Sequence, residues 1–291
     1  MNAIEITNLN KTYPGFTLKD LNLTLPQGCI LGLAGENGAG KSTTLSLIMN
    51  AISRDSGTIR VLGTDNQSAA FRSVKEDIGI VLDEAYFPEV LTPKNVGSIM
   101  GHTYRNWDPT TYASYLDRFS LPLDKAFKDF SRGMQMKLAI AVALSHAPKL
   151  LILDEATSGL DPMIRDEILE IFNDFTRDET HSILLSSHII SDLEKICDYI
   201  AFIHQGSLIL CEEKDRLLEE YALLKLSRAE LRLCMMTCIF LTRQRFRRRV
   251  SERERISRHL AIRQRPTRMV TTRNAPSTFP AQYWITMVWL F

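Results

Sequence analysis

Residues 35–43, GENGAGKST, combine glycines with a lysine and hydroxyl side chains in the spacing G-x-x-x-x-G-K-[ST]. Glycines let such a loop turn tightly and bring its N–H groups against phosphate oxygens, and a helix that begins there adds its positive N-terminal end. Lys41 could then lie between the β- and γ-phosphates, and the hydroxyl of Ser42 could ligate Mg²⁺. The run therefore predicts a site for a nucleoside triphosphate. Its predicted binding residues are Gly35, Asn37, Gly38, Ala39, Gly40, Lys41, Ser42 and Thr43.

Two acids end a strongly apolar run at residues 150–155, LLILDE. So apolar a strand is expected at the centre of a sheet, and ligands of open α/β sheets bind outside the carboxyl ends of the strands. Asp154 would hold the metal shell opposite Ser42, and Glu155 would orient or deprotonate an attacking water. A lone Asp-Glu pair can also simply lead a strand into solvent, but the upstream phosphate loop favours the catalytic interpretation.

Strand-like and helix-like runs alternate through residues 1–225. These elements must position the phosphate loop and the two acids at 154 and 155. The strand-like runs are 29–35, 78–82, 150–154, 182–187 and 199–204, and the helix-like runs are 41–50, 134–145, 162–178, 189–197 and 214–225. This alternation predicts an α/β fold with a mostly parallel central sheet covered by helices. HQGSL at 204–208, between two apolar runs, predicts a hairpin turn.

The 291 residues are 45% hydrophobic and 24% charged, which is typical of a globular protein with a sizeable core. No apolar stretch is as long as the roughly 18 residues that a helix needs to cross a bilayer. The first residues also lack the basic start and the apolar run of a signal peptide. The five cysteines form no C-x-x-C pair and no metal-ligand spacing, so we expect free thiols in a cytosolic protein.

Further motifs lie on both sides of the LLILDE strand. Upstream, FSRGM at 130–134 opens a helix-like run; downstream come ATSGLDP at 156–162 and SSH at 186–188. Together with the phosphate loop, this order of five motifs resembles the ATP-binding subunits of ABC transporters over residues 1 to about 225. The resemblance implies a P-loop NTPase fold with an N-terminal antiparallel β subdomain and an inserted α-helical subdomain at roughly 83–145.

The resemblance also implies roles for single residues. Tyr13 matches the aromatic residue that stacks on adenine, although a plain tyrosine at a strand end fits its surroundings equally well. Ser131 and Gly133 match the signature motif, which in the family contacts the γ-phosphate bound by the other subunit. Asp161 matches the D-loop acid at the dimer interface, and His188 matches the switch histidine that touches the γ-phosphate.

Two positions depart from the family's usual pattern. Asp83 stands where a glutamine usually follows the strand; its carboxylate could meet Mg²⁺ or the attacking water, but it adds negative charge beside the phosphates. The signature reads FSRGM instead of LSGGQ, with Arg132 and Met134 in place of a small residue and an amide. It is similar to the subset of the family with S-[RK]-G-M signatures, many of which serve small exporters with separate membrane subunits.

By this resemblance the protein hydrolyses ATP and drives a transporter, with export expected, whose membrane-spanning permease subunit is a separate polypeptide. Two ATP-binding subunits, forming a homodimer or a heterodimer, would face head to tail and clasp two ATP molecules. The expected place is cytoplasmic, peripheral on the inner face of the cell membrane. ATP and Mg²⁺ are the expected cofactors, and no nucleic acid is expected as a partner.

Two other classes of function remain as alternatives. A soluble ABC-type ATPase acting on nucleic acid or the ribosome usually has two cassettes in one chain, a long coiled-coil insertion or zinc ligands, and the sequence contains none of these. A nucleotide kinase or another P-loop enzyme would explain the phosphate loop but not the signature motif.

Residues 226–291 differ in composition from the rest. Residues 1–225 hold 21 Lys and Arg against 31 Asp and Glu, whereas residues 226–291 hold 14 Arg against 3 Glu and no Lys, Asp or Gly. This segment could be a basic arm for nucleic acid or anionic membrane, a family-specific regulatory domain, or a translation of a slipped reading frame. The residue bias favours a frame-shifted translation, for which we expect a disordered or poorly packed tail.

Overall fold

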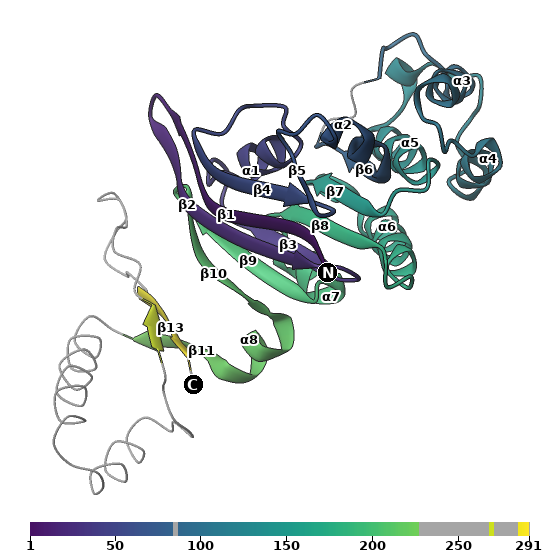
Figure 1. Ribbon diagram of the computed structural model, residues 1–291. Helices are drawn as coiled ribbons and strands as arrows, with labels where there is room; N and C mark the ends of the chain where they lie inside the picture. The colour runs from purple at the N-terminus through teal and green to yellow at the C-terminus, as the bar shows by residue number, and fades with distance from the viewer. Residues whose placement is uncertain (84–86, 227–267, 271–284, 291) are drawn as a thin grey trace, which may run out of the picture. The chain divides into compact units, whose positions relative to one another are not determined.

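Two β-sheets share one hydrophobic core in the first part of the chain (Figure 1). The computed structural model describes residues 1–83, 87–226, 268–270 and 285–290, and the chain divides into two compact units, Met1–Lys214 and Asp215–Phe291. None of the helices in these described ranges has the length and apolarity needed to cross a bilayer.

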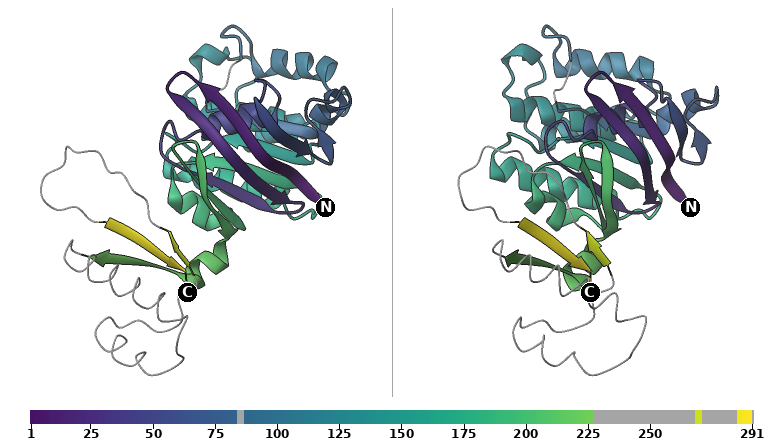
Figure 2. Two further views of the ribbon diagram at one scale, coloured as in Figure 1. Left: turned by 60° about the vertical axis from the view of Figure 1, so that its left-hand side comes forward. Right: turned by 90° about the vertical axis from the view of Figure 1, so that its left-hand side faces the viewer.

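An antiparallel sheet forms one layer of the first unit (Figure 2). Its strand order is β2-β1-β4-β5, with β1 at Asn2–Tyr13, β2 at Phe16–Pro26, β4 at Ser56–Val61 and β5 at Thr64–Asp65. Apolar residues alternate along β2, so that Leu18, Leu21, Leu23 and Leu25 are all buried on the core side. The predicted N-terminal antiparallel subdomain is therefore confirmed.

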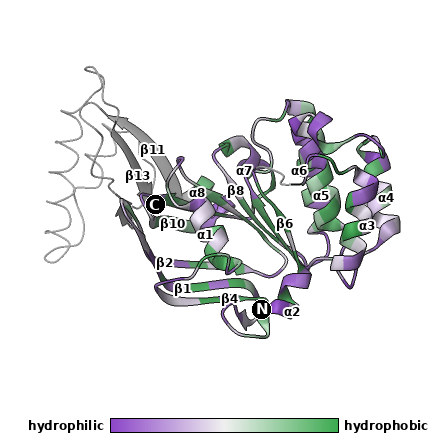
Figure 3. Cartoon of the chain, turned by 90° about the horizontal axis from the view of Figure 1, so that it is seen from above, coloured by the Kyte–Doolittle hydropathy of each residue, from purple (hydrophilic) through white to green (hydrophobic). Residues whose placement is uncertain are grey.

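The second layer is a six-stranded sheet with the order β10-β9-β3-β8-β7-β6. Its strands are β3 (Ile30–Ala34), β6 (Ile78–Val81), β7 (Leu150–Asp154), β8 (Ser182–Ser187), β9 (Tyr199–His204) and β10 (Ser207–Glu213). All neighbours pair in parallel except β9 and β10, which form the predicted hairpin. Every residue of β3 and β7 is buried, and Figure 3 shows hydrophobic residues running through the central strands. The mostly parallel central sheet is thus confirmed.

Helices that flank this sheet follow the strands in the chain. They are α1 (Lys41–Ile48), α6 (Pro162–Phe175) and α7 (Ile190–Ile196). The short α2 (Phe71–Val74) instead follows β5 of the antiparallel sheet, and a 3-10 turn, η1 at Lys75–Asp77, leads from it into β6. In α6 the residues Ile168, Leu169, Ile171 and Phe172 are buried and form the stripe that packs on the core.

Three further helices lie between β6 and β7 in the chain. They are α3 (Pro93–Thr103), α4 (Pro109–Arg118) and α5 (Arg132–Leu144), with a 3-10 turn η2 at Phe127–Asp129 before α5. Thr92 and Asn95 form a capping box on α3, and the Asp108 carboxylate caps α4 by accepting from the Thr110 N–H. This region is the predicted inserted helical subdomain.

The second unit contains α8 (Lys214–Glu220) and a three-stranded antiparallel sheet in the order β11-β13-β12. Its strands are β11 (Tyr221–Leu226), β12 (Arg268–Val270) and β13 (Ile285–Leu290). The prediction of one helix over 214–225 is wrong in its second half, because every residue of β11 pairs with β13 and its backbone follows that ladder instead. Most residues of the segment 226–291 lie outside the described ranges, so its disorder and its frame-shifted origin stay predictions. The predicted boundary near residue 225 between the ATP-binding domain and this segment also stays a prediction.

Candidate active site

The phosphate loop lies where the carboxyl end of β3 leads into α1. Gly40 is the N-cap of α1 with φ 113°, and no side chain caps the helix there. The first N–H groups of a helix have no partner within it, so this end of α1 offers donors and a positive dipole to an anion. By contrast, α5 and α6 begin with side-chain caps from Ser131 and Asp161.

A turn on the neighbouring hairpin supports this loop. The Gly206 N–H donates to the Ala39 carbonyl over 2.9 Å, and the Gly206 carbonyl accepts from the Lys19 N–H over 2.8 Å. A Cβ on Gly206 would lie 1.9 Å from the Thr17 carbonyl oxygen, and its φ of 75° disfavours other residues as well. The sequence predicted the hairpin but not that its glycine would hold the phosphate loop.

Lys41 reaches back over the loop that precedes it. Its side chain is only 6% exposed; its Nζ donates to the Gly35 carbonyl over 2.8 Å and forms an ion pair with Glu155 Oε1 at 3.2 Å. The Lys41 ammonium therefore bonds to a backbone carbonyl and a carboxylate, and phosphate oxygens could take the place of both partners.

Glu155 follows β7 in a left-handed backbone conformation, φ 48°, which is uncommon for a residue other than glycine. Its N–H donates to the carbonyl and to Oγ of Ser186, at 3.1 and 3.2 Å. Its Oε2 lies 2.6 Å from Nδ1 of His188, the residue after β8. The structure therefore brings Lys41, Glu155 and His188 together at the carboxyl ends of three neighbouring parallel strands.

Asp154 is the last residue of β7 and is only 8% exposed. The Ser186 hydroxyl donates to its Oδ1 over 2.5 Å, and the two residues are paired in the ladder between β7 and β8. Ser186 thus fixes the Asp154 carboxylate and also binds the backbone of Glu155. The local sequence did not indicate this role, although Ser186 is part of the SSH motif.

The predicted signature residues lie at the start of α5, where Ser131 is exposed and Gly133 is buried. The Ser131 hydroxyl accepts from the Met134 N–H over 3.3 Å, and a Cβ on Gly133 would lie 3.0 Å from Cδ1 of Ile164. The start of α5 is therefore packed against the start of α6, where Asp161 accepts from the Met163 and Ile164 N–H groups. Within the described residues, no hydrogen bond or ion pair joins this signature segment to the cluster around Lys41.

Asp83 lies just after β6, and its Oδ1 forms a 2.7 Å ion pair with Nη2 of Arg132. The two side chains are about half exposed. A Cβ on Gly159 would meet the Arg132 guanidinium at 3.2–3.4 Å, so Arg132 lies over this part of the chain between Glu155 and Asp161. The two departures from the family's pattern thus contact each other, which local sequence did not reveal.

Tyr13 lies at the end of β1 and is paired with Phe16 across the β1–β2 turn. Its ring is 38% exposed, with Lys11 Nζ 5.3 Å from its centroid. The Phe16 ring reaches the phosphate loop, because a Cβ on Gly40 would lie 2.9 Å from it. The hairpin that carries Tyr13 therefore borders the phosphate loop, which is where an adenine platform would be needed.

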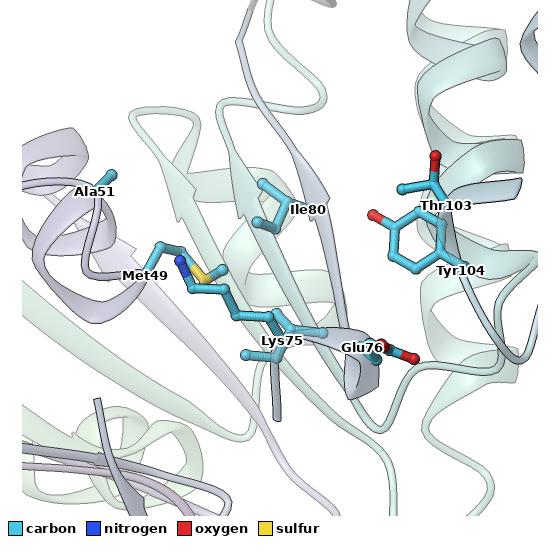
Figure 4. Close-up of a pocket in the computed structure, with 8 residues that line it drawn as sticks. Met49, Ala51, Lys75, Glu76, Ile80, Thr103 and Tyr104 are labelled. Carbon is cyan, nitrogen blue, oxygen red and sulfur yellow. The ribbon is translucent and has the colours of Figure 1, made fainter. Parts of the chain in front are cut away.

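A separate cavity of about 370 Å³ lies between β6, the end of α1 and the end of α3 (Figure 4). Met49, Lys75, Ile80 and Tyr104 are among its lining residues, and none of the predicted site residues lines it. The Tyr104 ring stacks on His146 with centroids 4.0 Å apart.

Comparisons with known proteins agree with this geometry. A family model described as ABC transporter matches residues 18–158. YtrB of Bacillus subtilis (strain 168), an ABC transporter ATP-binding protein, is 34% identical over 219 residues, which cover 75% of this chain and 74% of YtrB. SrtF of Streptococcus pyogenes, a lantibiotic transport ATP-binding protein, is 36% identical over 215 residues, which cover 73% of this chain and 91% of SrtF.

The fold comparison gives the same result. A solved structure described as the ATP-binding subunit of an ABC transporter matches with a TM-score of 0.66 and 26% identity, over 75% of this chain and 92% of that one. The chain therefore belongs to the family of ABC transporter ATP-binding proteins, and it binds and hydrolyses ATP to power transport.

Proposed function

We propose that ATP is hydrolysed at the cluster of Lys41, Glu155 and His188, and that a second ATP-binding subunit completes this site. The observation that carries the proposal is the continuous chain of contacts from Lys41 Nζ through the two Glu155 oxygens to His188 Nδ1. Such a chain at the carboxyl ends of parallel strands joins a phosphate-binding cation, a base and a hydrogen-bonding ring in one place.

In the mechanism that follows, Lys41 exchanges its Glu155 partner for oxygens of the β- and γ-phosphates. Glu155 Oε1 has no hydrogen-bond partner among the described residues even beside Lys41, so it is available for the attacking water. Glu155 orients this water and accepts its proton while the water oxygen bonds to the γ-phosphorus. The bond to the β-phosphate oxygen breaks, which leaves ADP and phosphate. His188 is held by Glu155 Oε2 through Nδ1, and its other ring nitrogen would donate to the γ-phosphate when both ring nitrogens carry a proton.

Mg²⁺ would be held by the hydroxyl of Ser42 and, through its shell, by the carboxylate of Asp154. The described residues contain no group of three or more His, Cys, Asp or Glu side chains able to hold a metal alone, which fits an ion that takes its remaining ligands from phosphate and water. Its chemistry there is to offset phosphate charge. For Asp83 to take part in the metal shell, its carboxylate would have to break the ion pair with Arg132.

The γ-phosphate of a bound ATP would be covered by Ser131 and Gly133 of the second subunit, with Asp161 at the interface. Two features support this. Ser131 and Asp161 are exposed, and each sits at the N-terminal end of a helix that favours an anion. Gly35, Asn37, Gly38, Ala39, Gly40 and Thr43 would line the phosphates, and Tyr13 would stack on adenine.

The partner in transport would be a membrane-spanning permease subunit, which places this protein at the cytoplasmic, inner face of the membrane. Export is the direction we propose, because the relative SrtF is named for lantibiotic transport and the signature reads S-R-G-M.

Glu155→Gln is the decisive test. We expect turnover to fall by roughly 10²–10⁴-fold, since the amide cannot accept the proton, while ATP binding is retained and ATP-dependent dimers accumulate. Phosphate release, ATP affinity by calorimetry and particle mass by light scattering measure the three effects. Lys41→Ala is the matched variant that should lose ATP affinity instead. Turnover near the wild-type rate in Glu155→Gln would remove this residue from the proposed role.

A further inference from the structure

An ion pair between a buried aspartate and a partly buried arginine joins α6 to α7 beside the active site. Asp192 in α7 is 1% exposed, and its Oδ2 lies 3.8 Å from Nε of Arg165 in α6. The Nη2 of Arg165 also donates to the carbonyl of Leu160 over 3.2 Å. The Arg165 guanidinium therefore contacts both the end of the segment between β7 and α6 and the first turn of α7.

The two ends of this contact lie next to residues of the proposed mechanism. Leu160 directly precedes Asp161, the residue we place at the interface with the second subunit. Asp192 lies in the first turn of α7, the helix that begins at Ile190, two residues after His188. Arg165 therefore spans from the interface loop to the helix that carries the catalytic histidine at its start.

The pair is incompletely bonded in the observed arrangement. Neither Nε of Arg165 nor Oδ2 of Asp192 has a hydrogen-bond partner among the described residues. The 3.8 Å separation is about 1 Å longer than an ordinary charge-assisted hydrogen bond. Buried charges are stabilised only when they are paired and fully hydrogen-bonded, so a small shift of α6 relative to α7 that closed this gap would be favourable.

We propose that Arg165 and Asp192 form a positioning link, which transmits docking of the second subunit at Asp161 to His188 within the same chain. When the second subunit contacts Asp161, the Leu160 carbonyl moves and carries Arg165 with it. Arg165 then forms a full hydrogen bond to Asp192. The resulting shift of α7 positions His188 beside the γ-phosphate. The inference rests on the proposed function, since it assumes that Asp161 meets the second subunit. Arg165 and Asp192 touch neither nucleotide nor water in this scheme.

The chain provides a matched control on the same two helices. Asp166 of α6 and Lys195 of α7 form a 2.6 Å ion pair, and both side chains are more than half exposed. A solvent-exposed pair of this kind contributes little to stability or coupling. Asp166→Asn therefore removes an α6–α7 contact without disturbing the buried link.

The test uses the purified full chain in four forms: wild type, Asp166→Asn, Asp192→Asn and the double variant Arg165→Met/Asp192→Asn. We expect Asp192→Asn to lower kcat roughly tenfold while the ATP dissociation constant stays within about twofold. With Glu155→Gln added, ATP-dependent dimers should still form. Asp166→Asn should match wild type in every measurement.

The double variant separates coupling from stability. Removing one charge leaves the other buried and unpaired, so Asp192→Asn should lower the thermal unfolding midpoint, and removing both should restore it. We expect kcat to stay low in the double variant. If the double variant recovered both kcat and the unfolding midpoint, the pair would be merely structural and the proposal would be wrong. Equal kcat values for Asp192→Asn and Asp166→Asn would also overturn the proposed link. Failure of the proposed function itself would show differently, as undiminished turnover in Glu155→Gln.

Discussion

The two halves of the proposed nucleotide site are built in opposite ways. Around Lys41 the functional side chains are bonded to one another, lysine to glutamate and glutamate to histidine; Lys41 and Glu155 are largely buried, and His188 is about half exposed. Around Ser131 the functional side chains are exposed, and their polar atoms bind the first N–H groups of their own helices. We call the set around Lys41 the finished half, because its side chains bond to one another within one chain. The set around Ser131 is the exposed half, which on our proposal acts only with a second subunit.

This difference follows from the elements that carry each half. Parallel strands in fixed register place Asp154, Glu155 and His188 at one edge of the sheet, and the fold itself supplies their neighbours. The helix starts at Ser131 and Asp161 are capped by these side chains but lie at the surface, where the positive end of each helix is open to an external anion or another subunit. On the proposed function, the half within one chain gives affinity for ATP, and the half from the second subunit makes hydrolysis depend on assembly.

Ser131→Asp is the sharpest way to break this comparison. Aspartate caps a helix as well as serine does, so the fold of α5 should be kept, but its charge would face the γ-phosphate. We expect kcat to fall roughly 10³-fold because like charges in such a site cost several kcal/mol. ATP binding to the isolated subunit, measured by calorimetry, should be unchanged. Ser131→Asn, a neutral residue that also caps, is the control and should lose much less.

Mixing variants tests whether the second half acts between chains. Copies with Lys41→Ala and copies with Ser131→Asp are each expected to be inactive alone. In a head-to-tail homodimer, a mixed pair holds one site with both halves intact, so an equal mixture should regain up to about a quarter of wild-type phosphate release. No gain over the separate variants would contradict an arrangement that uses the signature of the second copy.

His188→Ala tests the finished half at its exposed end. Loss of a donor to the γ-phosphate should lower kcat by about 10²-fold, with ATP affinity kept because Lys41 still holds the phosphates. His188→Gln, which retains a donor, should lose less. Single-turnover phosphate release measures the effect. A fall in ATP affinity as large as the fall in rate would instead give His188 a role in binding.

The local pattern of the sequence predicted the finished half well. The phosphate loop, the LLILDE strand and the SSH strand each carry their functional residues at a strand end, and the parallel arrangement of apolar strands brings such ends together. The predicted elements also match closely, since α6 begins at the expected Pro162 and β9 and β10 form the expected hairpin. Periodicity and motif spacing are local, so these features could be found without a structure.

Contacts between distant side chains could not be predicted in this way. Arg132 and Asp83 are 49 residues apart, and nothing in either local sequence indicates that they pair. The link from Arg165 to Asp192 depends equally on how α6 packs against α7. The end of α8 at Glu220 was missed for a similar reason, because the strand that follows it depends on pairing with β13.

The Asp83–Arg132 pair gives a smaller expected effect. An ion pair between half-exposed side chains is worth at most about 1 kcal/mol, so Asp83→Asn and Arg132→Gln should each change kcat by no more than about fivefold. The two changes should be similar, and raised salt should weaken the wild-type advantage. Steady-state rates at low and high salt measure this. A far larger loss for Asp83→Asn alone would favour the metal-shell role over the ion pair.

The smallest effect concerns the far end of the signature helix. His146 follows α5 closely; its Nδ1 is 3.1 Å from the Glu76 carbonyl, and its Nε2 has no hydrogen-bond partner among the described residues. Burial lowers the pKa of His146 below its ordinary 6.5, despite the nearby Glu76 and Asp77 carboxylates, which raise it. The folded state therefore binds this proton less readily than the unfolded state does, so stability is full above about pH 6.5 and declines as the pH falls below it.

His146→Asn should flatten this decline, because an amide can bind the Glu76 carbonyl and does not titrate. The measurement is the thermal unfolding midpoint of both proteins at pH 7.5 and at pH 5.5, where we expect the wild type to lose more. Since α5 carries Ser131 at its other end, acid should raise hydrogen exchange in α5 before it raises exchange in β3 or β7. Equal exchange in helix and strands would show that the exposed half of the site is held as firmly as the buried one.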